Sequence, residues 1–358
     1  MSNPLHDLQR LGQSVWLDAI RRSWLEPEGY LTRLVAAGDL DGLTSNPTIF
    51  EGALRDDASY DAQIRELAGA DPREAFWTIV KDDVRAACDL FLPHHEATGG
   101  RDGFVSIEVD PRKAFDTEET VAEALLLYRE LDRPNLMVKV PGTEPGLAAI
   151  RRLLAEGVSV NVTLLFSVAR YEQVCRAHLE GLRQLAQRGG DVARVASVAS
   201  FFVSRVDSKV DALLPADHPR RGVAAIANAR SAYGVFRDVV EGEDFAELAA
   251  LGAQPQRPLW ASTSSKDPAY RDVRYVEELA GPDTVNTMPQ ATVEAFRDHG
   301  VAQDRLTGSV EEARSRLAAL AEDGVDLDQV TKELETEGVD KFVASFDAAV
   351  DALAARLG

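Results

Sequence analysis

One lysine stands inside an otherwise apolar segment, LMVKVP at residues 136–141. This segment predicts a buried strand, so the amine of Lys139 is expected to be poorly solvated. An apolar environment favours the neutral amine, which is the form that attacks a carbonyl carbon and forms an iminium. Lys139 is therefore a candidate for Schiff-base chemistry, in which the iminium accepts electrons while a carbon–carbon bond breaks. The alternative is a solubilising lysine on an edge strand.

Two carboxylates interrupt apolar segments in the same way, Glu108 in VSIEVDP and Asp18 in VWLDAI. Near an iminium, two such groups can divide the work of a general acid and a general base. For Asp18 taken alone, N-capping of the following helix is an equally good interpretation.

Other apolar segments end in hydroxyl and carboxamide groups, carried by Thr44, Asn46, Asn161, Thr163 and Ser200. Asn46 can present its amide to substrate hydroxyls, but it also precedes a proline, and a lone asparagine in this position is more often simply a turn residue. A threonine within a strand is ordinarily a matter of strand propensity. Only the shared position at strand ends favours function for this group.

Two cations follow later apolar segments: Arg205 in SFFVSRVD, and Lys266 in ASTSSKD, beside Thr263, Ser264 and Ser265. Hydroxyls, a cation and the start of a helix together can bind phosphate. A surface cation after a strand is the alternative. In a chain with a formal net charge of −20, an anionic substrate has to be captured by a few local cations, which favours the phosphate interpretation.

In a barrel of parallel strands, catalytic residues lie at the carboxyl ends of the strands, where these side chains stand. Short apolar runs alternate here with longer stretches of helical periodicity, which is the pattern of βα units. The sequence predicts eight strands, at residues 14–18, 40–46, 103–110, 136–141, 159–166, 194–203, 257–263 and 283–289.

Amphipathic segments are expected to cover the outside of the barrel, at residues 119–131, 146–156, 168–188 and 222–240. The predicted fold class is α/β: a (β/α)8 TIM barrel, with additional helices in the insertion after the second strand and at the C-terminus. The insertion after the second strand is expected to contain several helices, one of them at residues 72–91. At the C-terminus, residues 309–356 are expected to form two helices. One domain spanning residues 1–358 is the simplest organisation. A doubly wound open sheet is the competing fold, but no GxGxxG or GxxxxGK[ST] motif follows any predicted strand.

The acidic composition argues against a nucleic-acid partner, which requires a clustered basic surface. Cys88 and Cys175 form neither a disulfide framework nor a metal motif, and the six histidines have no ligand spacing, so no metal is expected. No signal peptide and no apolar run long enough to cross a membrane is found. We expect a cytoplasmic protein without a membrane partner.

The sequence resembles the transaldolase family, and within it the longer bacterial branch. The resemblance rests on segments in family order along nearly the whole chain: SVWLD, TSNPTIF, VSIEVDPR, NLMVKVPGT, SVNVTLLFS, ASFFVSRVD, LWASTSSKDPAYRDV and GPDTVNTMP. It implies cofactor-free transfer of a dihydroxyacetone unit from sedoheptulose 7-phosphate to glyceraldehyde 3-phosphate. The products are erythrose 4-phosphate and fructose 6-phosphate, in the pentose phosphate pathway. A monomer or a homodimer is expected.

The resemblance also implies residue roles. Lys139 is the Schiff-base lysine and Asp18 the acid–base group for the cleaved hydroxyl, while Glu108 and Thr163 hold a proton-shuttling water. Substrate hydroxyls are bound by Asn46, Asn161 and Ser200, with Thr44 and Phe202 beside them. The phosphate is held by Arg205 and by the ASTSSK segment, through Thr263, Ser265 and Lys266.

Two other functions remain open. Aldolases of the same superfamily release free dihydroxyacetone and typically carry a glutamine and a tyrosine where this chain has Glu108 and Phe202. Those two residues favour transfer. A barrel that binds phosphosugars without chemistry is the more distant alternative, and the presence of Lys139 with both carboxylates argues against it.

Overall fold

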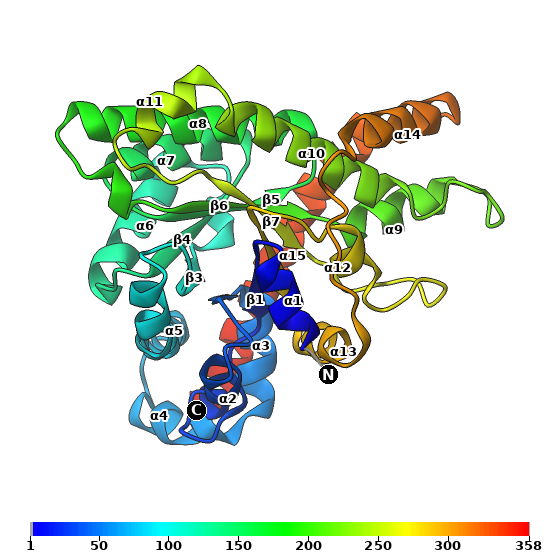
Figure 1. Cartoon of the computed structure of the whole chain (residues 1–358). Helices are drawn as coiled ribbons and strands as arrows, with labels where there is room; N and C mark the ends of the chain where they lie inside the picture. Colours follow the sequence, from blue (N-terminus) through cyan, green and yellow to red (C-terminus); the bar gives the residue numbers. More distant parts are fainter. Residues whose placement is uncertain (1–2, 358) are drawn as a thin grey trace.

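The eight predicted strands pair in sequence order and close into one parallel barrel (Figure 1). The structure is a computed structural model that describes residues 3–357. The strands are β1 (Gln13–Asp18), β2 (Gly42–Thr44), β3 (Phe104–Glu108), β4 (Leu136–Pro141), β5 (Val160–Leu165), β6 (Ser197–Phe202), β7 (Arg257–Ala261) and β8 (Thr284–Met288). The closing contact is the parallel pairing of β1 with β8. The TIM-barrel prediction is confirmed and the open sheet is excluded.

Helices surround the barrel, and the extra helices lie where the sequence predicts them. Those up to β3 are α1 (Pro4–Arg10), α2 (Tyr30–Ala36), α3 (Pro47–Asp56), α4 (Asp61–Glu66) and α5 (Pro72–Ala97). The middle of the chain forms α6 (Thr117–Leu131), α7 (Glu144–Ala155), α8 (Val168–Gln187), α9 (Ser204–Leu213), α10 (Ala224–Val240) and α11 (Glu243–Ala249). The remainder are α12 (Arg274–Glu278), α13 (Gln290–His299), α14 (Val310–Glu322) and α15 (Leu327–Leu357). None of the described helices is long and apolar enough to span a membrane.

Side-chain caps set where several covering helices begin. The Thr143 hydroxyl accepts a hydrogen bond from a backbone N–H in the first turn of α7, and Ser167 does the same for α8. Asp116 caps α6, which therefore begins before the predicted residue 119. The strand predicted at 40–46 is shorter than expected, because Asn46 is already the N-cap of α3. These caps fix the residues at which the covering helices begin.

The barrel interior is filled by large side chains. Trp16 on β1 is fully buried, and its indole ring lies against Gly42 on the neighbouring strand β2. A Cβ atom added at Gly42 would lie 2.6 Å from that ring, well inside van der Waals contact. Glycine at position 42 is therefore what allows Trp16 to fill the barrel below the Asp18 end of β1.

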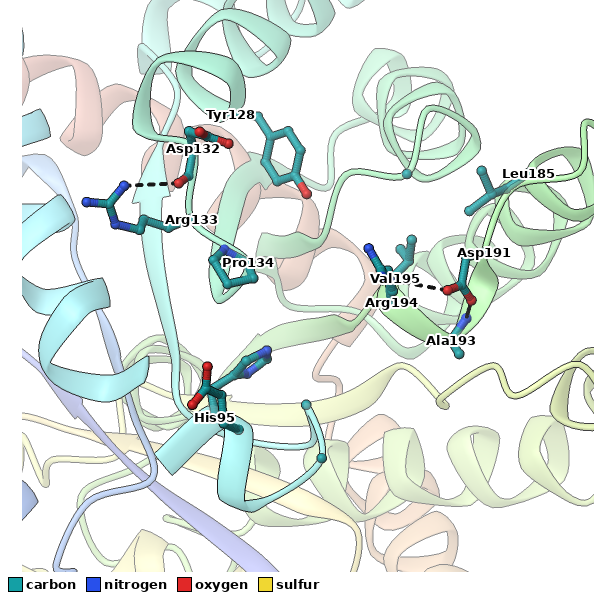
Figure 2. Close-up of a pocket in the computed structure, with 14 residues that line it drawn as sticks. His95, Tyr128, Asp132, Arg133, Pro134, Leu185, Asp191, Ala193, Arg194 and Val195 are labelled. Atoms are coloured by element: carbon teal, nitrogen blue, oxygen red, sulfur yellow. Dashed lines mark hydrogen bonds and ion pairs between the residues drawn. The ribbon is translucent and has the colours of Figure 1, made fainter. Parts of the chain in front are cut away.

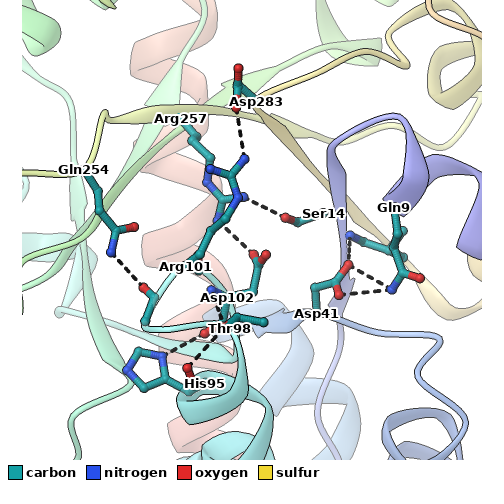
Figure 3. Close-up of polar contacts among 12 residues, drawn as sticks. Gln9, Ser14, Asp41, His95, Thr98, Arg101, Asp102, Gln254, Arg257 and Asp283 are labelled. Atoms are coloured by element: carbon teal, nitrogen blue, oxygen red, sulfur yellow. Dashed lines mark hydrogen bonds and ion pairs between the residues drawn. The ribbon is translucent and has the colours of Figure 1, made fainter.

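A buried arginine closes the opposite end of the barrel, where the strands begin (Figure 3). The guanidinium of Arg257 donates to the Ser14 hydroxyl at 2.7 Å and to the Arg101 carbonyl at 2.8 Å. It also forms an ion pair with the Asp102 carboxylate at 2.9 Å. Both charged side chains are almost completely buried. Removing one of them would leave the other charge buried and unpaired.

We therefore expect Arg257→Met to lower the free energy of unfolding by about 3–5 kcal/mol, as measured by urea unfolding. Turnover of the folded protein should be unchanged, because the candidate active site lies at the other end of the barrel. The control is Arg188→Met, since Arg188 is exposed and pairs with Glu156 on the surface. Its effect should stay within about 0.5 kcal/mol. Similar losses in the two variants would contradict a special role for Arg257.

Candidate active site

A cavity of about 260 Å³ lies at the carboxyl end of the strands. Side chains from seven of the eight strands and their following loops line it, together with one residue of α15. The lining residues are Asp18, Thr44, Asn46, Thr48, Ile49, Lys139, Thr163, Ser200, Phe202, Arg205, Ala261, Ser262, Ser264, Lys266, Thr287, Pro289 and Phe342. The structure thus brings together most of the residues selected from the sequence.

Lys139 lies on the central part of β4 and is 4% exposed. Its Nζ atom is 3.1 Å from Glu108 Oε2 on the adjacent strand β3, and it donates to the Ser45 carbonyl at 3.3 Å. Since β4 pairs with β3 on one side and β5 on the other, the edge-strand interpretation of Lys139 is wrong. The Lys139 side chain is buried, and it forms part of the cavity wall.

Glu108 is the deepest charged group of the site and does not line the main cavity. Burial raises the pKa of its carboxyl, while the nearby amine of Lys139 opposes that shift. Apart from the ion pair with Lys139, its two oxygens have no hydrogen-bond partner among the described residues, and the same holds for the buried hydroxyl of Thr163. Two buried polar groups on either side of Lys139 therefore have unused hydrogen-bonding capacity.

Asp18 begins a chain of hydrogen bonds that joins the neighbouring strands β1, β2 and β8. Its Oδ1 accepts from the Thr44 hydroxyl at 2.7 Å, and the Thr44 and Thr287 hydroxyls lie 2.8 Å apart. The next helical turn begins at Arg22, with Arg21 in the N-cap position and no side-chain cap. Asp18 therefore caps no helix here, and its carboxylate faces the cavity.

The carboxamides are placed differently from each other. Asn46 lines the cavity, and its Oδ1 caps α3 by accepting from the Ile49 N–H at 3.1 Å. Asn161 is fully buried beneath the cavity. It accepts from the Ser200 hydroxyl at 2.7 Å and donates to Ser106 at 3.0 Å. Asn161 thus orients Ser200, which does face the cavity.

Arg205 and Lys266 stand together at one side of the cavity. The Arg205 guanidinium lies 5.0 Å from the centre of the Phe202 ring, which is itself part of the cavity wall. Burial lowers the pKa of both cations, the neighbouring Arg205 lowers that of Lys266 further, and the Asp18 carboxylate opposes both shifts. Neither cation forms an ion pair within the described chain. Two cations without an ion-pair partner, side by side in a cavity wall, are an arrangement that can bind an anion.

The structure does not place the Thr263 and Ser265 hydroxyls at this anion region, contrary to the sequence-based expectation. Thr263 is fully buried, and its hydroxyl lies 3.0 Å from Asn286 Oδ1 and 3.2 Å from the Thr287 carbonyl. Ser265 donates to the Asp267 carbonyl at 3.1 Å. The cavity is lined instead by Ser262 and Ser264. Ser262 stands directly after β7 and has a φ of 57°, in the left-handed region.

A larger hollow of about 760 Å³ lies at the opposite end of the barrel, where helices lead into β3 to β6 (Figure 2). The side chains of His95 and Tyr128 border it. Its two arginines are already paired, Arg133 with Asp89 and Arg194 with Asp191. Enzymes of this fold carry their chemistry at the carboxyl ends of the strands, so this hollow is not the candidate active site.

Thr287 and Phe342 are among the cavity residues that were not selected from the sequence. Thr287 follows the inward-facing alternation of β8, and its segment GPDTVNTMP was already part of the resemblance, so a signal for it was present. Phe342 is different, because it comes from α15 at the far end of the chain. Its ring centre lies 5.6 Å from Lys139 Nζ. The helical pattern of residues 309–356 contains no sign of that contact.

The fold and the site define an α/β-barrel protein with a buried amine–carboxylate pair at the end of the barrel where enzymes of this fold act. Residues 15–353 match the model of the transaldolase/fructose-6-phosphate aldolase family. The chain belongs to this family. Residues 3–357 hold no group of three or more His, Cys, Asp or Glu side chains arranged to bind a metal ion.

Similar proteins cover almost the full chain. A protein of Parafrankia sp. named transaldolase is 50% identical, with 100% of this chain and 99% of the relative aligned. Proteins of the same name from Saccharopolyspora erythraea and Thermobifida fusca are 52% and 50% identical. The alignments cover 96% of this chain and 94% of the relative in the first case, and 100% and 99% in the second.

Proposed function

We propose that this protein is a transaldolase that transfers a dihydroxyacetone unit from sedoheptulose 7-phosphate to glyceraldehyde 3-phosphate. The observation that carries the proposal is the Lys139 amine, buried 3.1 Å from Glu108 and open to a cavity that also contains Asp18. Full-length similarity to proteins named transaldolase supports it. The products would be erythrose 4-phosphate and fructose 6-phosphate.

In this proposal, Lys139 attacks the ketone carbon of the donor and loses water to form an iminium. Asp18 then takes the proton from the hydroxyl group on the carbon beyond the bond that breaks, and the electrons of that bond move to the iminium. An enamine of three carbons stays on Lys139 while the aldehyde product leaves. Attack of the enamine carbon on the acceptor aldehyde reverses these steps, so Asp18 returns its proton. No cofactor is needed, since the iminium is the electron sink.

Forming and hydrolysing the iminium requires proton transfer to and from water beside Lys139. Glu108 and Thr163 are the groups we propose for holding that water. Their unused hydrogen-bonding capacity next to Lys139 supports this role. The raised pKa of Glu108, caused by burial, makes this carboxyl better able to carry a proton than an exposed one.

The donor's hydroxyl groups would be bound by the polar wall of the cavity. Ser200 is held by Asn161, and Thr44 by Asp18, so both hydroxyls are already oriented. The amide nitrogen of Asn46 remains for a substrate hydroxyl, because its oxygen caps α3. Phe202 provides an apolar surface at the side of the cavity near Arg205.

The coupled assay for this proposal supplies sedoheptulose 7-phosphate and glyceraldehyde 3-phosphate and measures both products. Erythrose 4-phosphate and fructose 6-phosphate should appear in equal amounts. Release of dihydroxyacetone without acceptor dependence would support the aldolase alternative instead. Binding of the donor without any product would support a phosphosugar-binding barrel.

We further propose a cytoplasmic enzyme, which suits its two buried free cysteines.

We expect Arg205→Ala to weaken use of phosphorylated donors through a higher Michaelis constant. The unpaired guanidinium of Arg205 would contact the phosphate by a charge-assisted hydrogen bond, worth about 2–3 kcal/mol. Steady-state kinetics with fructose 6-phosphate and with unphosphorylated fructose separate the roles, since only the phosphorylated donor should lose affinity. Arg129→Ala, an exposed arginine on α6, is the control. Equal losses on both donors would mean that Arg205 is structural or catalytic.

A further inference from the structure

We propose that Phe342, on the C-terminal helix α15, determines whether the three-carbon unit on Lys139 is transferred to an acceptor or released to water. Phe342 would act as a positioning and shielding residue, without taking part in proton transfer. This inference rests on the proposed function. It concerns a residue far along the chain from the barrel strands that carry the other cavity residues.

The position of α15 makes this role possible. The helix crosses the barrel and continues past α3 and α4 to the C-terminus (Figure 1). Its residue Phe342 is 4% exposed and forms part of the cavity wall together with Asp18 and Lys139. The ring centre is 5.6 Å from Lys139 Nζ, within the range of a cation–π interaction. Glu108 and the Ser45 carbonyl contact this amine as polar groups, whereas Phe342 presents an aromatic ring to it.

Gly338, Phe342 and Phe346 are spaced four residues apart, so they lie on one face of α15. This face packs against the barrel and α5. Gly338 lies so close to β5 that an added Cβ would be 2.9 Å from Leu164 Cδ2. Leu164 has a φ of 60°, at a point where the pairing of β5 with β6 shifts its register. On the other side of Phe342, the Phe346 ring lies 5.0 Å from Phe76 of α5. Phe342 is thus held between two packed contacts and directed at Lys139.

The enamine on Lys139 has two possible fates. In transfer, its nucleophilic carbon forms a bond with the aldehyde carbon of the acceptor, and Asp18 supplies the proton for the new hydroxyl group. In release, that carbon takes a proton derived from water, and the resulting iminium is hydrolysed. Release consumes one water molecule per enamine, yields dihydroxyacetone and regenerates the amine, with no change in oxidation state. The two routes therefore compete for the same intermediate.

An apolar ring beside Lys139 disfavours release, because it excludes water from that side of the intermediate. Its face also stabilises the positively charged iminium, the state from which the carbon–carbon bond of the donor breaks. Removing the ring should allow water to reach the enamine carbon before an acceptor binds. Transfer should then fall while release rises, so the ratio of the two products reports on Phe342 separately from overall activity.

The experiment measures dihydroxyacetone released and acceptor converted in the same reaction, with fructose 6-phosphate and erythrose 4-phosphate. For Phe342→Ala we expect the release-to-transfer ratio to rise on the order of tenfold. Phe342→Leu keeps apolar volume and should give a smaller rise, and it decides the question if the alanine variant does not fold. Leu353→Ala removes a buried side chain of the same helix outside the cavity. Its ratio should equal that of the wild type.

The outcomes separate this inference from the proposed function. Transfer by the wild type, with an unchanged ratio in every folded Phe342 variant, would overturn the inference and leave the proposed function intact. A ratio raised equally in Leu353→Ala would also overturn it, because loosening of α15 would then be the cause. A wild-type protein that transfers nothing would overturn the proposed function and this inference with it.

Discussion

Replacing Lys139 by methionine should abolish trapping by borohydride and lower the rate of transfer on the order of 10⁴- to 10⁶-fold. Methionine has a similar length and no amine, so it fills the space on β4 but cannot form an iminium. With the wild type, borohydride and fructose 6-phosphate should leave one reduced three-carbon adduct on Lys139. Peptide mass spectrometry identifies the labelled residue.

Other lysines provide the controls for this experiment. Lys81 and Lys113 lie in ion pairs with Glu130 and Glu123, outside the cavity. Lys81→Met should therefore keep both trapping and transfer. An adduct on Lys81, Lys113 or Lys209, or a Lys139→Met protein that still transfers at a substantial rate, would show that Lys139 is not the nucleophile.

The second largest effect is expected for Asp18→Asn, which should lower turnover by about 10²- to 10⁴-fold. An amide cannot take the hydroxyl proton when the carbon–carbon bond breaks. Its oxygen can still accept the hydrogen bond that the Thr44 hydroxyl gives to Asp18, so the local structure should persist. Because Lys139 remains, the Schiff base should form and accumulate. Borohydride trapping should thus persist while transfer stalls.

Asp116→Asn is the matched control, since Asp116 caps α6 and asparagine caps a helix about as well as aspartate. It should retain wild-type turnover and stability. For Asp18→Asn, a circular dichroism melt like that of the wild type would show that the protein is folded. Near-normal turnover in that folded variant would assign the acid–base step to another group.

Much of the barrel was predictable because its pattern is local. Each strand is a short apolar run between turns and each covering helix has its own amphipathic period, so eight strands and their main helices could be located residue by residue. The boundaries were less accurate where a side chain capped a helix early, as Asn46 and Asp116 do. Lys139, Glu108 and Asp18 were also recognisable, because a charged residue in an apolar run is unusual.

Side-chain orientation at the ends of strands was less predictable. Thr263 and Ser265 have the right residue types and the right location for a phosphate site, but their hydroxyls bond to neighbouring strand and loop atoms. Ser262, directly before them, has a left-handed backbone angle that its residue type does not predict. Asp18 was ambiguous for a similar reason, until the position of Thr44 showed that it faces the cavity.

By itself, then, the sequence determined the strand order, the buried amine and the acidic background against which Arg205 and Lys266 stand out. Only the tertiary structure decided which neighbours these groups have: that Lys139 lies 3.1 Å from Glu108, that Asn161 holds Ser200, and that Phe342 covers the amine. Local periodicity records whether a residue is buried, since burial follows from the face of its own helix or strand. Local periodicity does not show which side chains of other segments a residue contacts, because those contacts depend on how distant segments pack once the barrel has closed.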